Sequence, residues 1–192
     1  MMHNTPRLTL SERSPAEDDG EPDFFLGAWN PEGELHLHYT PPPGPPLCTS
    51  RSERWFLAGT ASPLHGRSKS PVHAPEAGSG EPAGLAFRGY LLDPPLHTWS
   101  DSCALLRYWA SPPESHNGLF AAARIGEGGR CLELITDAFG IAPLYYRIWQ
   151  GLVLFSNLPR LLAAAGDRMD RLAGRALIQF GYPAGDRSLT CG

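Results

Sequence analysis

The chain has 192 residues, of which 42% are hydrophobic and 19% are charged, and its formal net charge is −4 at pH 7. This length fits one domain with a sizeable hydrophobic core. The 16 Lys and Arg residues are outnumbered by 20 Asp and Glu residues and form no basic patch, which argues against a groove for nucleic-acid phosphates.

No apolar run of about 18 residues is present, and residues 1–22 lack the apolar region of a secretory signal. We therefore expect a cytoplasmic chain that does not enter a membrane. His36 and His38 share one face of a predicted strand, but no acidic or thiol partner stands at ligand spacing, so no metal site is expected. The scattered cysteines predict reduced thiols; they are Cys48, Cys103, Cys131 and Cys191.

The first half of the chain alternates between strand patterns and segments rich in Pro and Gly. Asp23–Asn30 is apolar and ends in the turn sequence N-P-E-G, and Glu34–Tyr39 alternates with period 2, so these runs predict a hairpin. Residues 41–84 include nine Pro and six Gly. Within them only Arg54–Gly59 has strand character, and the rest is predicted to be a mobile insertion.

The second half predicts an antiparallel arrangement of strands joined by tight turns. The expected strands are Leu85–Leu92, Leu119–Ile125, Cys131–Thr136, Leu144–Ile148 and Leu152–Ser156. Three helices are expected at Ser102–Ala110, capped by Ser100 or Asp101, at Asn157–Ala165 and at Asp170–Phe180. Two antiparallel sheets with helices packed on them make an α+β fold, which we favour over an all-β fold because of these helices.

One long segment is typical of a known family. Residues 117–146 read NGLFAAARIGEGGRCLELITDAFGIAPLYY and are followed by GLVLFSN. This resembles the glutaminase-type (class II glutamine amidotransferase) domain of the asparagine synthetase family, in which G-x-F-A-F, R-D-x-x-G-x-x-P-L-Y-Y and F-[AS]-S-E follow in this order. LAFRGYLLD, TWSDSCALLRYW, FFLGAW and DRSLTCG resemble further family segments. The most specific matching residues are Asp137, Gly140, Pro143, Leu144 and Tyr145.

The resemblance covers roughly residues 23–192, is thin over 41–84, and leaves residues 1–22 as a flexible extension. It implies an N-terminal-nucleophile (Ntn) hydrolase-like αββα sandwich of two antiparallel sheets with flanking helices. Asp137 lies in the most family-like segment, yet D-A-F-G is also a turn in which an aspartate bonds nearby main-chain N–H groups, and we favour this structural role. Tyr145 and Tyr146 are interpreted as sheet aromatics rather than ligand contacts.

The resemblance also implies that the glutamine site is degenerate. In the family the nucleophile is an N-terminal cysteine whose α-amino group, with a pKa near 8, acts as the base. Alignment of the opening strands places Asp23 there, and 22 residues precede it. The family's Asn-Gly oxyanion pair reads Arg88-Gly89, the acidic residue that follows reads Tyr90, and Asp101 alone is retained, where it also serves as a helix cap.

The chain is therefore expected to have a structural role and not to hydrolyse glutamine. The S-G-G-x-D-S loop of the family's ATP-pyrophosphatase domain does not occur in these residues. The resemblance implies that such a synthetase domain or chain, using ATP and Mg²⁺, is the partner of this chain, which would act as a docking domain of an amide-forming system without a cofactor of its own. Two alternatives stay open: a working amidotransferase domain that supplies ammonia after processing exposes Cys48, and a stand-alone binding or regulatory module.

Overall fold

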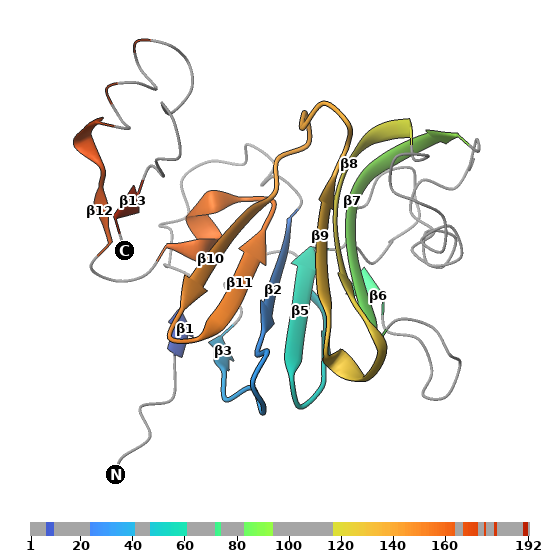
Figure 1. Cartoon of the computed structure of the whole chain (residues 1–192), viewed down its shortest axis with the longest axis vertical. Helices are drawn as coiled ribbons and strands as arrows, with labels where there is room; N and C mark the ends of the chain where they lie inside the picture. The colour runs from blue at the N-terminus through green and yellow to red at the C-terminus, as the bar shows by residue number, and fades with distance from the viewer. Residues whose placement is uncertain are drawn as a thin grey trace. The chain divides into compact units, whose positions relative to one another are not determined.

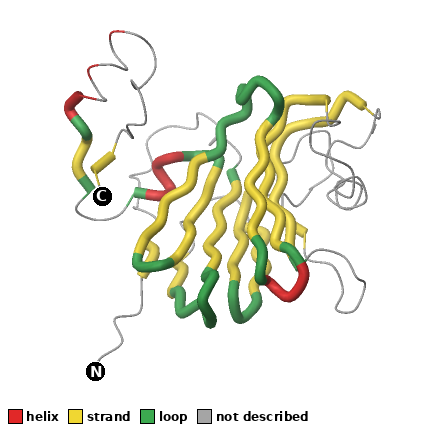
Figure 2. The backbone as a smooth tube through the Cα atoms, in the orientation of Figure 1, coloured by secondary structure: helices red, strands yellow, loops and turns green. Residues whose placement is uncertain are grey.

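The computed structural model describes two units of the chain (Figure 1), Met1–Leu162 and Ala163–Gly192. The described residues are 7–9, 24–40, 47–60, 72–73, 83–93, 117–163, 167–172, 175, 179 and 190–191. In the first unit, two antiparallel sheets contain most of these residues (Figure 2).

The larger sheet has five strands in the order β10-β11-β2-β5-β4, and every neighbouring pair is antiparallel. Its strands are β10 (Tyr145–Trp149), β11 (Leu152–Ser156), β2 (Phe25–Trp29), β5 (Trp55–Thr60) and β4 (Leu47–Arg51). β2 and β5 lie inside the sheet and are buried along almost their whole length, which agrees with their continuous apolar runs. β10 and β11 are joined by Gln150 and Gly151, both with positive φ, as the tightest hairpin turns require.

The smaller sheet has four antiparallel strands in the order β6-β7-β8-β9. Its strands are β6 (Val72–His73), β7 (Gly84–Asp93), β8 (Asn117–Ile125) and β9 (Leu132–Thr136). A register shift between Leu91 and Asp93 marks an irregularity at the end of β7. The β8–β9 connection contains the 3₁₀ turn η3 (Glu127–Gly129), and the carbonyl of Gly129 accepts a 2.7 Å hydrogen bond from the indole N–H of Trp29 in the larger sheet.

The two sheets pack face to face around one apolar cluster. Alternate residues of each strand point between the sheets, as the period of two dictates. The buried members are Phe25, Trp55, Leu57 and Phe155 from the larger sheet, and Val72, Ala86, Ala121, Ala123 and Ile125 from the smaller one. The ring of Phe155 lies directly over Gly27, where a Cβ atom would be 2.0 Å from the ring, so Gly27 makes room for this ring.

Each sheet also buries apolar residues on its outer face. On the larger sheet, Leu161 and Leu162 of the 3₁₀ turn η4 (Pro159–Leu162) pack on the cluster that contains Leu26 and Leu154. On the smaller sheet, the outer cluster consists of Leu85, Phe87, Leu91, Phe120 and Ala122, with Ile135 packed against it. Both faces of each sheet are therefore apolar, which explains the near-continuous hydrophobic runs in the sequence.

Two small pairings complete the described structure. β3 (His38–Thr40) pairs in parallel with β1 (Arg7–Thr9), a strand within the segment predicted as a flexible extension. In the second unit, β12 (Arg168–Met169) and β13 (Thr190–Cys191) are antiparallel. None of the helical segments in the described part of the chain has the length and apolar character needed to cross a membrane.

The α+β class and the Ntn-hydrolase-like αββα sandwich are wrong. Two antiparallel sheets are present, but no described helix reaches seven residues, so the fold is mostly β without flanking helical layers (Figure 2). Of the helix expected at 157–165, only the 3₁₀ turn η4 is observed, and the side-chain oxygen of Asn157 accepts a hydrogen bond from the main-chain N–H of Phe25. Of the segment 170–180, residues 171, 172, 175 and 179 are helical, and the helix expected at 102–110 lies outside the described residues.

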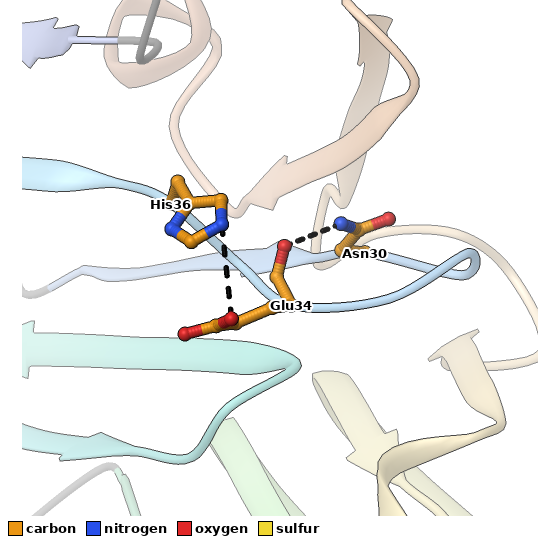
Figure 3. A network of polar contacts seen from close by, with 3 residues as sticks. All are labelled: Asn30, Glu34 and His36. Carbon is orange, nitrogen blue, oxygen red and sulfur yellow. Dashed lines mark hydrogen bonds and ion pairs between the residues drawn. The ribbon is translucent and has the colours of Figure 1, made fainter. Parts of the chain in front are cut away.

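The hairpin expected from residues 23–39 does not form either. β2 pairs with β5 and β11, while residues 34–37 run as an irregular segment whose Leu35 and Leu37 pack on the outer face of the larger sheet. The side-chain amide of Asn30 donates to the main-chain oxygen of Glu34 at 2.7 Å, and the exposed side chains of Glu34 and His36 approach each other at 3.8 Å between Oε2 and Nε2 (Figure 3). The alternation of apolar and polar residues at 34–37 therefore reflects the packing of a loop on the sheet and not strand pairing.

Residues 41–84 contribute more order than the sequence predicts. They contain β4, β5 and β6, and β5 lies inside the larger sheet. Composition averaged over this range hides the five-residue strand Leu47–Arg51, because the run PPPGPP at 41–46 directly precedes it. The insertion is therefore partly integral to the sheet.

Candidate functional site

The family-like residues gather at one end of the two-sheet unit. β2 begins at this end, while β5, β11 and β7 finish there, and the connection from β9 to β10 crosses it (Figure 1, top of the sheets). Gly84, at the other end of β7, packs against Trp55 and Leu57, so β7 runs toward the start of β2. Residues 88–90 and 137–144 therefore lie at the same end as residue 24.

The start of β2 is held by three buried polar side chains. The N–H of Phe24 donates to Thr60 Oγ1 at 2.9 Å, and the N–H of Phe25 donates to Asn157 Oδ1 at 2.8 Å. Ser156 Oγ donates to the carbonyl of Phe25 at 2.6 Å and accepts a bond from the N–H of Leu158 at 3.0 Å. These contacts join the ends of β5 and β11 to the first residues of β2.

These three residues were missed as site residues in the sequence. Their signal is weak: Ser156 and Asn157 are simply two polar residues after the apolar run LVLF, and Thr60 ends the run WFLAG. Their partners lie 36, 131 and 132 positions away in the chain, so no local pattern reveals the pairing. The hydroxyl of Ser156 is fully buried and is engaged both as donor and as acceptor, which leaves it no role as a nucleophile in this structure.

The expected glutamine pocket is only partly described. Arg88, Gly89 and Tyr90 are consecutive residues of β7, opposite Ala121, Phe120 and Leu119 of β8. Arg88 is half-buried and points to the inter-sheet side together with Ala121, by the alternation of the strand, while Tyr90 is exposed. Asp23 and Asp101, the expected nucleophile position and retained aspartate, lie outside the described residues.

Gly89 has a structural reason to be glycine. Its φ is +117°, a conformation that side chains rarely adopt, and a Cβ atom there would lie 2.1 Å from the carbonyl oxygen of Leu119. The same strands approach closely at Gly118, where a Cβ atom would be 2.2 Å from the oxygen of Tyr90. Close approach of β7 and β8 accounts for this glycine without any ligand.

Asp137 has the structural role expected from the sequence. Its Oδ1 accepts hydrogen bonds from the N–H groups of Phe139 and Ile141 at 3.0 and 3.1 Å, and its Oδ2 accepts from Ala142 at 2.8 Å. The Ala142 bond, together with the other two, holds the pKa of the Asp137 carboxyl below its usual value, although burial acts in the opposite direction. This buried carboxylate therefore stays ionised and organises its own turn.

The rest of the family motif surrounds this turn. Gly140 has a φ of +63°, and its N–H donates to the carbonyl of Asp137 at 2.9 Å. The N–H of Asp137 donates to the carbonyl of Phe120, the residue opposite Gly89, so the turn is tied to β8. Pro143 is exposed, Leu144 packs on the inter-sheet cluster, and Tyr145 begins β10. The motif thus forms the crossing from one sheet to the other.

Cys48, the nucleophile of the alternative hypothesis, lies in β4 at the edge of the larger sheet. It is opposite Gly59, which is itself opposite Phe25, so the three residues form one row across the sheet. The Cys48 thiol is half-buried and stands two strands, or about 10 Å, from β2. Within the described ranges, no group of three His, Cys, Asp or Glu residues is arranged to hold a metal ion.

Neither the protein-family models nor the curated proteins with which the sequence was compared match this chain.

Proposed function

We propose that this chain is a catalytically inactive relative of the glutamine-hydrolysing domain of the asparagine synthetases, one whose described residues form two antiparallel sheets without flanking helical layers. In this proposal it acts in the cytoplasm as a structural and docking partner of an ATP-dependent, amide-forming synthetase domain or chain. ATP and Mg²⁺ belong to that partner, and neither nucleic acid nor a membrane is a ligand. The motif from Asp137 to Tyr145 and the order of segments around it support the relationship.

One observation carries the proposal of inactivity. Where the family presents a cysteine with a free α-amino group, this chain continues through Asp23 into Phe24, whose main-chain N–H is a peptide group bonded to Thr60. The hydroxyls and the amide at this point, from Thr60, Ser156 and Asn157, hold the main chain of β2. Nucleophilic catalysis of this type needs a nucleophile in contact with a base, and these contacts serve β2 instead.

A glutaminase assay tests the inactivity. We expect the purified chain to release no glutamate from glutamine above a buffer blank, and the Cys48→Ala variant to behave in the same way. Release that disappears in Cys48→Ala would establish the amidotransferase alternative. Release that persists in that variant would also contradict the proposal, because it would require a different nucleophile.

Docking is tested separately, by purifying a tagged copy of the chain from the cells that make it. We expect a protein that carries an S-G-G-x-D-S loop to copurify, and mass spectrometry identifies this loop directly. The tag alone, expressed at the same level, is the control. Recovery of the chain without any such protein would contradict the docking role and would favour a stand-alone module.

A further inference from the structure

The chain contains a single Asn-Gly pair, and the structure places it on the surface at the end of a strand. Asn117 is the first residue of β8, its side chain is exposed, and Gly118 follows it. Glycine has no Cβ atom and the widest choice of main-chain conformations, so it hinders the approach of its own nitrogen to the preceding side chain least. Asparagine is also among the thermolabile residues. This pair is therefore suited to a reaction between main chain and side-chain amide.

Strand pairing around Asn117 is irregular. Gly118 is opposite Leu91 in the register between β8 and β7. Asn117 is opposite Asp93, which leaves Leu92 of β7 without an opposite residue. An extra residue of this kind disrupts the ladder of hydrogen bonds locally, and the ends of strands open at little cost in free energy. The main chain at Asn117 can therefore leave its extended conformation, as an attack on its side chain requires, while the rest of β8 stays paired.

The other described asparagines lack this combination of features. Asn30 precedes Pro31, whose nitrogen carries no hydrogen to lose. Asn157 is buried and precedes Leu158, and its Oδ1 accepts the hydrogen bond from the N–H of Phe25. These two residues are therefore internal references for the reactivity of Asn117.

We propose that Asn117 is a site of spontaneous deamidation through a succinimide, and that the product loosens the start of β8. The main-chain nitrogen of Gly118 loses its proton and forms a bond to Cγ of Asn117. The bond between Cγ and Nδ2 then breaks, and the side-chain nitrogen leaves as ammonia with that proton. Water opens the ring at either of its carbonyl groups, so the products at position 117 are aspartate and isoaspartate. The reaction consumes water and needs no oxidant.

Isoaspartate changes β8 more than aspartate does. Its main chain runs through the former side chain and is longer by one carbon atom, so the spacing no longer matches that of a strand. The first residues of β8 then lose their pairing with the part of β7 that follows Gly89. This part of β7 lies at the end of the sheets where the family-like residues gather, and the inference does not depend on the proposed docking role.

Peptide mapping by mass spectrometry, after incubation of the full chain in mildly alkaline buffer, tests the site. We expect residue 117 to convert into two products that separate by chromatography, faster at higher pH because the attacking nitrogen must lose its proton. The rate should be within about tenfold of that in the short peptide S-H-N-G-L-F, since the strand end opens easily. Asn30 and Asn157 should stay unchanged. Asn117→Gln should abolish the conversion; it is preferred to Gly118→Ala, whose Cβ atom would lie 2.2 Å from the oxygen of Tyr90.

Amide hydrogen exchange tests the effect on β8. We expect the first N–H groups of β8 to exchange faster in the purified isoaspartate form than in Asn117→Asp, which carries the same charge on a main chain of normal length. An Asn117 that keeps its amide in the folded chain, while the peptide S-H-N-G-L-F converts, overturns the proposal. Equal exchange in the isoaspartate form and in Asn117→Asp overturns the loosening of β8.

Discussion

At the end of the sheets where β2 begins, the identity of single residues is explained by the main-chain groups that they bind or approach. The carboxylate of Asp137 binds three N–H groups of its own turn, and Ser156 binds a carbonyl and an N–H around β2. Gly89 is required by the approach of β8. A family motif that would be assigned to a substrate site thus has a sufficient structural explanation at each of these positions.

The pH dependence of stability follows from Asp137. Because the pKa of its carboxyl is lowered in the folded chain, its ionised form stabilises the fold above the unfolded-state pKa of about 4. That contribution is lost as the pH falls through the lower, folded-state pKa. We therefore expect Asp137→Asn to lower the midpoint of chemical unfolding at pH 7, and the difference from the unmodified chain to shrink below pH 4. A difference that is constant down to pH 2 would contradict this role.

Gly89 should be intolerant of any side chain. Gly89→Ala places a Cβ atom 2.1 Å from the oxygen of Leu119 in a backbone conformation that alanine disfavours, so we expect a loss of about 3 kcal/mol or more in unfolding free energy. Gly128→Ala is the control. Gly128 also has positive φ, but nothing lies within 4 Å of its Cβ position, so the loss should be about 1–2 kcal/mol. Equal losses would show that close approach is unimportant.

At the scale of elements, the strands of the second half and the antiparallel pairing of consecutive strands there were predictable, whereas β4, β6 and the pairing of distant strands were not. β7, β8, β9, β10 and β11 were expected within two residues of their observed ends, because alternation and tight turns are local signals. The pairing of β2 with β11, more than 120 residues later, has no local signal. The expected 23–39 hairpin does not form, because β2 pairs with β5 and β11 on its two sides.

The hydrogen bonds that Thr60, Ser156 and Asn157 make with the start of β2 give a test at this scale. Asn157→Ala leaves the buried N–H of Phe25 without its acceptor, so we expect a loss of about 1–3 kcal/mol in unfolding free energy, measured by denaturant titration. Asn30→Ala is the matched control, since the Asn30 contacts to residues 32 and 34 are exposed, and it should cost about 0.5 kcal/mol or less. An Asn157→Ala variant with an unchanged unfolding free energy would contradict the role of Asn157 in holding β2.

At the scale of the whole molecule, the described part of the first unit buries three apolar clusters, one between the two sheets and one on the outer face of each sheet. Each cluster joins residues that are far apart in the chain, so the stability of this unit depends on contacts between distant segments.

The sequence by itself determined the strands of the second half, the turn around Asp137 and the structural role of that aspartate. All of these depend on neighbours a few positions away. Tertiary structure alone decided that β4 and β5 belong to the larger sheet, that the side chain of Asn157 bonds the main chain of β2, and that Tyr145, Tyr146 and Ile148 of β10 are exposed. These outcomes depend on which distant surfaces meet. The free energy of burial depends on the area removed from water and not on separation along the chain, so local patterns cannot reveal it.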